Sequence, residues 1–153
     1  MTSQAHSRSC PLNDRLQPVE SDDGWILPVA GQQVTRCTVD YAALGLLLIN
    51  GVNLNIEGEL TYRGPAGVEY TVDIEAEPAS AAPLLSLLRK NVRAGKAFKD
   101  GRLEVHFEGG ESIHVPADQK FEAWEVIGPH GFRIVSMPGG ELAIWHNWDP
   151  DRP

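Results

Sequence analysis

The chain has 153 residues, of which 42% are hydrophobic and 22% are charged, and its formal net charge is −8. This length and composition suit one soluble domain that folds without disulfides or a structural metal, and they exclude an intrinsically disordered protein. The acidic balance disfavours binding to nucleic acid or to an anionic membrane.

The number of cysteines and the hydropathy of the chain narrow the class of protein further. The two cysteines, Cys10 and Cys37, are too few for a disulfide framework. We expect Cys37, which falls in a strand pattern, to behave as a small buried hydrophobe. The longest apolar run, residues 41–49, has nine residues, far short of the ~20 that cross a bilayer. Because the N-terminal segment lacks the apolar core of a signal peptide, the sequence predicts a cytoplasmic protein with no membrane partner.

The N-terminal segment also lacks the periodicity of regular structure. Residues 1–23 contain Ser, Asp and Pro, which predicts a disordered or loosely attached tail. We expect a single domain over residues 24–147 and a frayed C-terminal tail over residues 148–153.

Strand patterns fill the first half of this domain. The expected strands are residues 34–40, 44–49, 53–56, 60–62 and 68–74. Asn50-Gly51, between the second and third, is the strongest short hairpin signal in the chain.

One helix is expected over residues 80–92. Ser80 suits an N-cap, and Pro83 falls in the first turn, where its missing N–H costs nothing. Gly95 is a natural stop. The apolar face of this helix would consist of Leu84, Leu85, Leu87, Leu88 and Val92.

Two further strand patterns, residues 103–107 and 113–115, predict a hairpin. Pairing the last residue of the first with the first residue of the second keeps the apolar side chains on one face. This register leaves a three-residue loop, residues 109–111. It also places His106 opposite His114 on the other face.

The last quarter of the chain has the pattern of a β-meander. Three apolar runs between Phe121 and Trp145 are separated by turn signals at residues 128–131 and 138–140. The expected fold class is therefore α+β, predominantly antiparallel hairpins plus this C-terminal meander, with one main α-helix. The sheet either curls into a partly open barrel or splits into two halves.

A weak internal repeat bears on that choice. Shifting the chain by 59 positions matches Leu44, Leu46, Leu48, Gly51, Leu54, Ile56 and Tyr62 with Leu103, Val105, Phe107, Gly110, Ile113, Val115 and Phe121. Any two amphipathic hairpins can be aligned in this way, so duplication and chance both stay open. A two-residue turn at Asn50-Gly51 would also pair Leu47 with Leu54, which turns the opposite face inward.

Two segments resemble a known family. Glu122-Ala123-Trp124 and the run GGELAIW at residues 139–145 resemble the closing segment of a family of small actinobacterial proteins. That family carries a domain of unknown function and ends in a Gly-Gly-Glu-Leu-Ala-x-Trp stretch. Residues 33–41 are similar to its opening segment, so the resemblance covers residues 30–146. It implies a small, bacterial, intracellular α+β domain and assigns no catalytic residue.

The sharpest candidate site is the histidine pair. Two imidazoles opposed across an antiparallel pair, His106 and His114, can supply two ligands to a zinc ion. A third ligand would come from Glu104, Glu111, His130 or His146, none of which lies at a diagnostic spacing. The alternative is that both histidines face solvent on the wet side of a sheet.

A basic stretch offers a second candidate. Between Arg89 and Arg102 lie six basic residues and one acid. Arg89, Lys90 and Arg93 can form an interaction surface for an anionic group. Alternatively, they complement the dipole at the end of the expected helix. Because Phe98 is the one aromatic residue in the stretch, stacking on nucleic acid bases is poorly supported.

Three tryptophans crowd the C-terminal end. We expect Trp124 and Trp145, on meander strands, to be core or half-buried. Trp148 is expected to be exposed, either as an interface anchor or docked on its own domain.

No recognised catalytic or nucleotide-binding motif is present, and we expect no cofactor. The first hypothesis is a non-catalytic, regulatory or immunity-like interaction protein that binds a basic protein partner. The second is a small-molecule-binding domain that uses the cavity of a curled sheet or the groove beside the helix. The third is an enzyme assisted by a metal at His106 and His114. The oligomeric state stays open.

Overall fold

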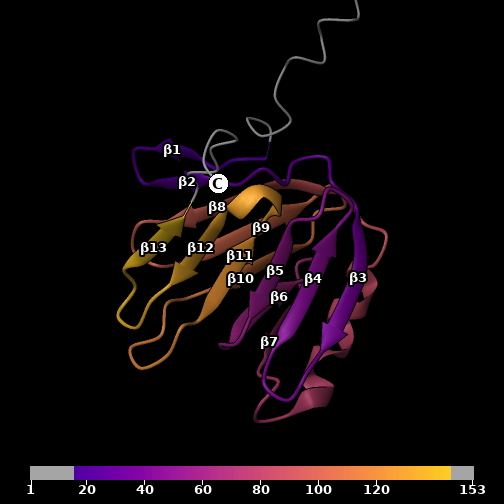
Figure 1. Ribbon diagram of the computed structural model, residues 1–153. Coiled ribbons are helices and arrows are strands. Elements are labelled where there is room, and N and C mark those ends of the chain that lie inside the picture. Colours follow the sequence, from indigo (N-terminus) through magenta and orange to yellow (C-terminus); the bar gives the residue numbers. More distant parts are fainter. Residues whose placement is uncertain (1–15, 146–153) are drawn as a thin grey trace, which may run out of the picture.

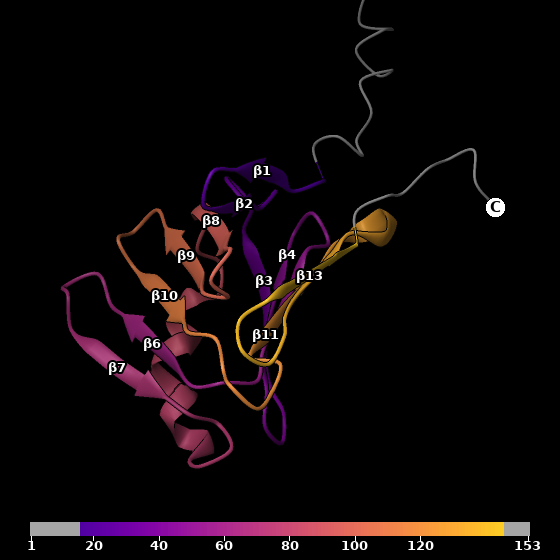
Figure 2. The same ribbon diagram turned by 90° about the vertical axis from the view of Figure 1, so that its left-hand side faces the viewer.

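Two antiparallel β-sheets face each other across one hydrophobic core (Figures 1 and 2). The computed structural model describes residues 16–145, and strands make up 46% of the structure. The expectation of a predominantly antiparallel fold is confirmed. The two sheets stay open and do not close into a barrel.

The sheet nearer the viewer in Figure 1, here the front sheet, has the strand order β13-β12-β11-β5-β4-β3. The C-terminal meander is confirmed as β11–β12–β13, with a short 3-10 helix, η2 (Pro129–Gly131), in its first turn. The strands are β3 (Val34–Val39), β4 (Leu44–Leu48), β5 (Asn53–Ile56), β11 (Trp124–Ile127), β12 (Arg133–Ser136) and β13 (Leu142–Trp145).

The second sheet, here the back sheet, has the order β1-β2-β8-β9-β10-β6-β7. Its strands are β1 (Val19–Ser21), β2 (Gly24–Ile26), β6 (Leu60–Arg63), β7 (Glu69–Val72), β8 (Val92–Phe98), β9 (Leu103–Phe107) and β10 (Ser112–Val115). The sequence missed β1, β2 and β8. Ordered structure begins earlier than expected, because β1 and β2 form a hairpin that pairs with β8. Residues 1–15 and 146–153, which hold most of the expected tails, lie outside the described residues.

The strands β4 and β9 show why alternating apolar residues in the sequence predict strands with one buried face. Successive side chains of a strand point to opposite faces, so every second residue of each strand enters the core. Burying each of these side chains contributes roughly 1.5–3 kcal/mol. The inward residues are Leu44, Leu46, Leu48, Leu103, Val105 and Phe107.

The expected α-helix is wrong. The sequence predicts it over residues 80–92, but the segment forms a 3-10 helix, η1 (Pro78–Leu87). Pro83 lies inside this helix and has no N–H to donate, which disfavours continuous bonding from each residue to the fourth before it. Ser80 is not its N-cap, because the Ser80 hydroxyl instead accepts the Asp73 N–H at 3.0 Å.

The spacing of the apolar residues explains the difference. A 3-10 helix has about three residues per turn, so Ala81, Leu84 and Leu87 lie along one side, and all three are buried. Leu85 and Leu88, which α-helical spacing places on the apolar face, are exposed. The helix η1 contacts the edge strands β3 and β7 of the two sheets, and so covers one open side of the sandwich.

The β9–β10 hairpin has a three-residue loop, but one position earlier than expected. The Phe107 N–H donates to the Glu111 carbonyl at 2.9 Å, so the loop is residues 108–110 and not 109–111. The loop ends on Gly110, whose φ of +96° is the left-handed conformation that such a loop needs.

This shift changes the neighbours of both histidines. His106 lies opposite Ser112, and His114 lies opposite Glu104. The expected direct pairing of His106 with His114 is therefore wrong.

The β4–β5 turn has the same construction. The Leu48 N–H donates to the Val52 carbonyl at 2.8 Å, and Gly51 closes the loop at a φ of +94°. The loop therefore has three residues and not two. As a result Leu54 pairs with Leu46, both face the core, and the conflict with the repeat disappears.

Strand pairing shows that the chain consists of two equivalent halves. Strands β3, β4 and β5 form a meander in the front sheet, and the chain then crosses to the back sheet for the β6–β7 hairpin. Strands β8, β9 and β10 form the same meander in the back sheet, followed by β11 and β12 in the front sheet. Each half supplies strands to both sheets, so neither half can bury its core alone.

Hydrogen bonds between the halves come in equivalent pairs. The Val34 N–H donates to the Lys90 carbonyl, and the Val92 N–H donates to the Gln32 carbonyl, both at 2.9 Å. Such matched bonds do not arise from a chance alignment of two hairpins. The internal repeat therefore reflects a structural duplication.

One of the seven sequence matches is wrong. Tyr62 and Val126 occupy equivalent positions, because each pairs with the third meander strand of the other half. The sequence instead matches Tyr62 with Phe121. The reason is that the second sheet-crossing linker, residues 116–123, is longer than the first, residues 57–59.

A buried carbonyl joins the two sheets. The Trp124 indole N–H and the Ser136 hydroxyl, both in the front sheet, donate to the Gly101 carbonyl at 2.8 and 2.9 Å. Gly101 lies in the β8–β9 turn of the back sheet. A Cβ at Gly101 would stand 2.5 Å from the Cα of Gly140 in the β12–β13 turn. The two turns can therefore touch only with glycine at these positions.

Arg89 and Gly31 occupy equivalent positions in the two halves, and both have a left-handed backbone conformation. This conformation predicts that a glycine at position 89 stabilises the fold. The φ values of Arg89 and Gly31 are +71° and +79°, a conformation that costs a residue with a side chain about 1 kcal/mol. We expect Arg89→Gly to raise the free energy of unfolding by about 1 kcal/mol in urea titrations, and Gly31→Ala to lower it by a similar amount. A loss of stability in Arg89→Gly would show that the Arg89 side chain outweighs its backbone strain.

The exchange of strands between sheets predicts fragment complementation. We expect fragments 1–76 and 77–153 to lack strand structure when separate, because β6 loses its partner β10 in the first fragment and β11 loses its partner β5 in the second. Mixed in equal amounts, they should regain the circular dichroism of the intact chain and co-elute in gel filtration. A fragment that folds alone would contradict this prediction.

Candidate functional site

The chain crosses between the sheets twice at one end of the molecule, and a hollow forms there. Residues 57–59 lead from β5 to β6, and residues 116–123 lead from β10 to β11. The Glu57 and Gly58 N–H groups both donate to the Ala123 carbonyl at 2.9 Å, so the linkers lie side by side. The hollow beside them has a volume of 460 Å³.

Carboxylates dominate the lining of this hollow, which we call the acidic groove. Among the described residues, no Lys, Arg or His lines it, and none of its acidic side chains forms an ion pair. Unpaired charges of one sign in a hollow attract a cation. The acidic residues are Glu57, Glu59, Asp73, Glu75, Asp118 and Glu122.

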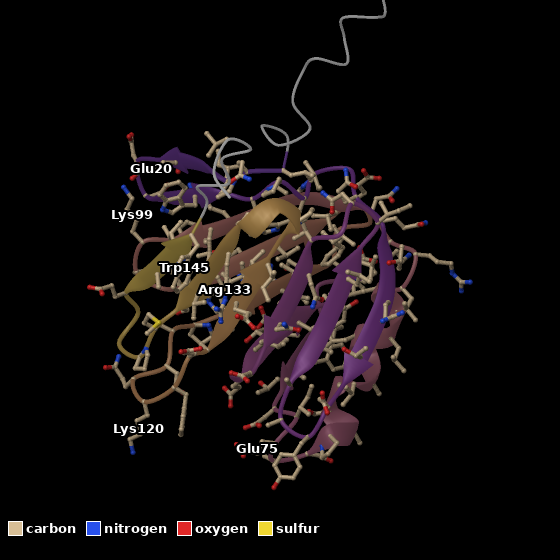
Figure 3. The ribbon with its side chains drawn as sticks, viewed as in Figure 1. Glu20, Glu75, Lys99, Lys120, Arg133 and Trp145 are labelled. Atoms are coloured by element: carbon tan, nitrogen blue, oxygen red, sulfur yellow. The ribbon has the colours of Figure 1, made fainter. Side chains whose placement is uncertain are left out.

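Local hydrogen bonds hold the walls of the groove. The Asp118 carboxylate accepts the N–H groups of Lys120 and Phe121 at 2.7 and 3.1 Å, and the Asp73 carboxylate accepts a backbone N–H at 3.1 Å. Figure 3 shows Glu75 and Lys120 at this lower end of the molecule. The Phe121 side chain is 67% exposed and lies on the groove, which therefore combines carboxylates with one apolar contact.

Sequence reasoning misses the acidic groove. Its carboxylates come from the two crossing linkers and from the segment after β7, which are far apart in the chain. The repeat is the signal that can find it, because an exact alignment of the halves makes the two crossing linkers equivalent.

The histidines of the predicted metal site lie on the outer face of the back sheet, with Glu104 between them. His106 Nε2 is 3.3 Å from Glu104 Oε1, and His114 Nδ1 is 3.7 Å from Glu104 Oε2. The two rings meet edge to face, with centroids 5.6 Å apart. Arg102 Nη1 also reaches Glu104, at 3.1 Å, so a cationic side chain already shares this carboxylate.

Across residues 16–145, no group of three or more His, Cys, Asp or Glu side chains is placed to hold a metal ion. Of the additional ligands that the sequence offers, His146 lies outside the described residues and Glu111 is buried beside Lys90. A metal site at His106 and His114 stays a prediction.

The basic stretch runs along strand β8, and acidic side chains neutralise much of it. Figure 3 shows Glu20 and Lys99 side by side. The Lys96 ammonium bonded to Asp23 holds the pKa of that carboxyl below its usual value. The stretch is therefore not a free row of phosphate-binding cations. The ion pairs of the stretch within the described residues are Lys90–Glu111, Lys96–Asp23, Lys99–Glu20, Arg102–Asp100 and Arg102–Glu104.

The residues that the sequence offers as an interaction surface are Arg89, Lys90 and Arg93, and all three are exposed. Arg89 and Arg93 form no ion pair within the described part of the chain. The alternative interpretation, that these residues complement a helix dipole, is wrong, because η1 carries no basic residue in its last turn. Their interaction role stays a prediction, and Trp148 lies outside the described residues.

Two other expectations concern buried side chains. Cys37 is a half-buried free thiol packed against the core, and desolvation by burial raises the pKa of this thiol, so Cys37 packs and does not serve as a ready nucleophile. Trp124 is buried as expected. Trp145 is instead 51% exposed, with the Arg133 guanidinium 5.3 Å from its ring centre (Figure 3).

A model described as a family of unknown function (DUF6188) matches residues 25–146. The chain belongs to this family. No curated protein matches the chain. The family description assigns no activity. It also gives no organism and no motif, so the actinobacterial origin and the Gly-Gly-Glu-Leu-Ala-x-Trp motif stay predictions.

The residues that the structure describes include no helix long and apolar enough to cross a membrane.

Glu111 is a buried carboxylate at a position that the first half fills with Val52. Equivalent turn bonds end on the carbonyls of Val52 and Glu111. The Glu111 side chain is 3% exposed, and its Oε1 has no hydrogen-bond partner among residues 16–145. Its described ion pair is with Lys90 Nζ, 3.7 Å from Oε2. A buried charge in this setting destabilises the fold unless its partner offsets the desolvation.

The ion pair between buried Glu111 and Lys90 predicts opposite changes in the free energy of unfolding when its two residues are replaced. We expect Glu111→Val to raise the free energy of unfolding by about 1–3 kcal/mol, and Lys90→Met to lower it because the carboxylate is left without its ion pair. Adding Lys90→Met to Glu111→Val should then have little effect. Urea denaturation of the four proteins measures this cycle, and additive effects would contradict the coupling.

Proposed function

We propose that the protein is a non-catalytic interaction module that binds a basic segment of a partner protein in the acidic groove. The observation that supports this is the set of six carboxylates on one hollow. Gathered charges of one sign steer an opposite charge and disfavour the wrong partner. The net charge of −8 acts with the same sign at longer range.

The composition of the groove favours lysine or arginine side chains as the groups that enter it. Each has an apolar stem and a cationic head. The exposed Phe121 ring offers a surface for the stem or for a cation–π contact. The carboxylates of Glu59 and Glu75, both exposed, offer acceptors for the cationic heads.

This role corresponds to a regulatory or immunity-like protein that covers the basic surface of its partner. Such binding forms fast and weakens with salt, because charge attraction drives the encounter. A bacterial, cytoplasmic setting, expected from the sequence, belongs to this proposal.

The volume of the groove supports a second candidate function. A hollow of 460 Å³ falls in the range of about 300–1,000 Å³ typical of small-molecule sites. Because its lining is acidic, the ligand would be a small organic polycation and not an apolar molecule.

A titration with a labelled ten-residue lysine peptide tests the first function. We expect the triple variant Glu59→Gln, Glu75→Gln, Glu122→Gln to bind about tenfold more weakly than the wild type in fluorescence anisotropy at low salt. The matched control is Glu20→Gln, Glu69→Gln, Glu141→Gln, which removes the same charge from exposed positions outside the groove.

Equal losses in the two triple variants would contradict a groove site and indicate general charge attraction. Loss of binding in Phe121→Ala, which changes no charge, would place the peptide beside the ring. Tighter binding of spermidine than of the lysine peptide, measured by displacement of the labelled peptide, would favour the small polycation.

A further inference from the structure

A second hollow lies on the outer face of the front sheet, over the strands β3, β4 and β5 (Figure 1). It has a volume of 230 Å³ and shares no lining residue with the acidic groove. Among the described residues, its lining contains one cationic side chain and no carboxylate. The lining residues are Arg36, Thr38, Gly45, Leu47 and Asn53. The two hollows therefore suit ligands of different charge.

This hollow lies where the two halves of the chain differ. Gly45 pairs with Asn55 on the front sheet, as Glu104 pairs with His114 on the back sheet. Gly45 is therefore the counterpart of Glu104, whose side chain occupies the equivalent place. A Cβ at Gly45 would overlap Thr38 Oγ1 and stand 3.4 Å from Asn55 Oδ1. The glycine keeps this part of the sheet surface open.

The cationic side chain of the hollow is available to a ligand. Arg36 is exposed and forms no ion pair within residues 16–145. On strand β8, by contrast, acidic side chains pair with Lys96 and Lys99. A guanidinium presents its N–H groups in a planar fork that fits both oxygens of a carboxylate. Arg36 therefore favours a ligand that carries a carboxylate.

The other groups of the hollow suit a ring that carries hydroxyl groups. The Thr38 hydroxyl and the Asn53 amide can each donate and accept hydrogen bonds. Leu47 lies directly between Arg36 and Asn53 in the sheet, because it pairs with both. Its half-buried side chain offers an apolar surface between the polar groups. A pyranose ring has hydroxyl groups at its rim and C–H groups on its faces, which matches this arrangement.

We propose that this hollow binds one hexuronic acid unit, a pyranose sugar that carries a carboxylate. The Arg36 fork holds the carboxylate, and the ring stacks its C–H groups on Leu47. Thr38 and Asn53 bond the ring hydroxyls. A volume of 230 Å³ lies just below the range of about 300–1,000 Å³ typical of drug-sized ligands, which fits a single sugar unit. The site is separate from the acidic groove and adds a second ligand to the proposed function.

The acidic net charge of the chain does not prevent this binding. At physiological ionic strength, interactions between exposed charges more than about 8 Å apart are largely screened, so the groups that line the hollow decide its preference. Glu125 lies on the same face of the sheet, opposite Asn55. Its carboxylate pairs with Arg133 at 2.7 Å, which offsets its charge.

Titration of the ¹⁵N-labelled full chain with sodium galacturonate tests the site by amide chemical shifts. We expect saturable shifts of the amide signals of Gly45, Leu47 and Asn53. Galactose, which lacks the carboxylate, and sodium acetate, which lacks the hydroxyls, should each bind at least about tenfold more weakly. Binding of trigalacturonate more tightly than galacturonate supports the site as one for a polysaccharide, and equal binding supports it as one for the free acid.

Two variants test the assigned contacts. Arg36→Gln removes the guanidinium fork, and Asn53→Asp adds a like charge without a change of size. We expect each to weaken galacturonate binding at least about tenfold, with a thermal melting temperature close to that of the wild type. The matched control is Arg93→Gln, which removes one charge from an exposed strand position outside the hollow. It should bind as the wild type does.

Three results would overturn the proposal. The first is the absence of saturable shifts at Gly45, Leu47 and Asn53 in the wild type. The second is binding of acetate or galactose as tight as that of galacturonate. The third is an equal loss of binding in Arg36→Gln and Arg93→Gln, which would indicate general charge attraction.

Discussion

The carbonyl of Gly101 is the group on which the rest of this structure depends. It is a back-sheet acceptor that takes two donors from the front sheet, the Trp124 indole and the Ser136 hydroxyl. All of these groups are buried, so each lost bond would leave an unsatisfied polar group at a cost of about 1–3 kcal/mol. The same turn contacts Gly140, whose N–H closes the β12–β13 turn.

This junction also positions the proposed binding groove. Ala117 lies where a Cβ on Gly101 would meet it, at 2.8 Å, and the Gly139 N–H donates to the Asp118 carbonyl at 2.8 Å. The second crossing linker is therefore attached to the turns that join the sheets. Since Asp118 and Ala123 of this linker line the acidic groove, a wall of the groove is fixed by contacts made outside it.

Much of the fold was predictable because strand patterns have a period of two. The strands β4, β5, β9 and β11–β13 follow from alternating apolar residues and glycine turns. Three-residue loops were harder, since the position of Gly110 and not the dipeptide Gly109-Gly110 decides where the loop closes. That shift of one residue is why the sequence paired His106 with His114. Strand periodicity could not find the acidic groove, because linkers have no periodicity, and only an exact alignment of the two halves makes the two crossing linkers equivalent.

The duplication shows where the two halves carry different side chains on a common scaffold. Equivalent strand positions carry Gly45 and Asn55 on the front sheet but Glu104 and His114 on the back sheet, as the pairings of Gly45 with Asn55 and of Glu104 with His114 show. The residues that carry the resemblance, Trp124 and the Gly139-Gly140 pair, serve the junction at Gly101 and its turn. A motif built from such residues identifies the fold, and the function must be sought where the two halves differ.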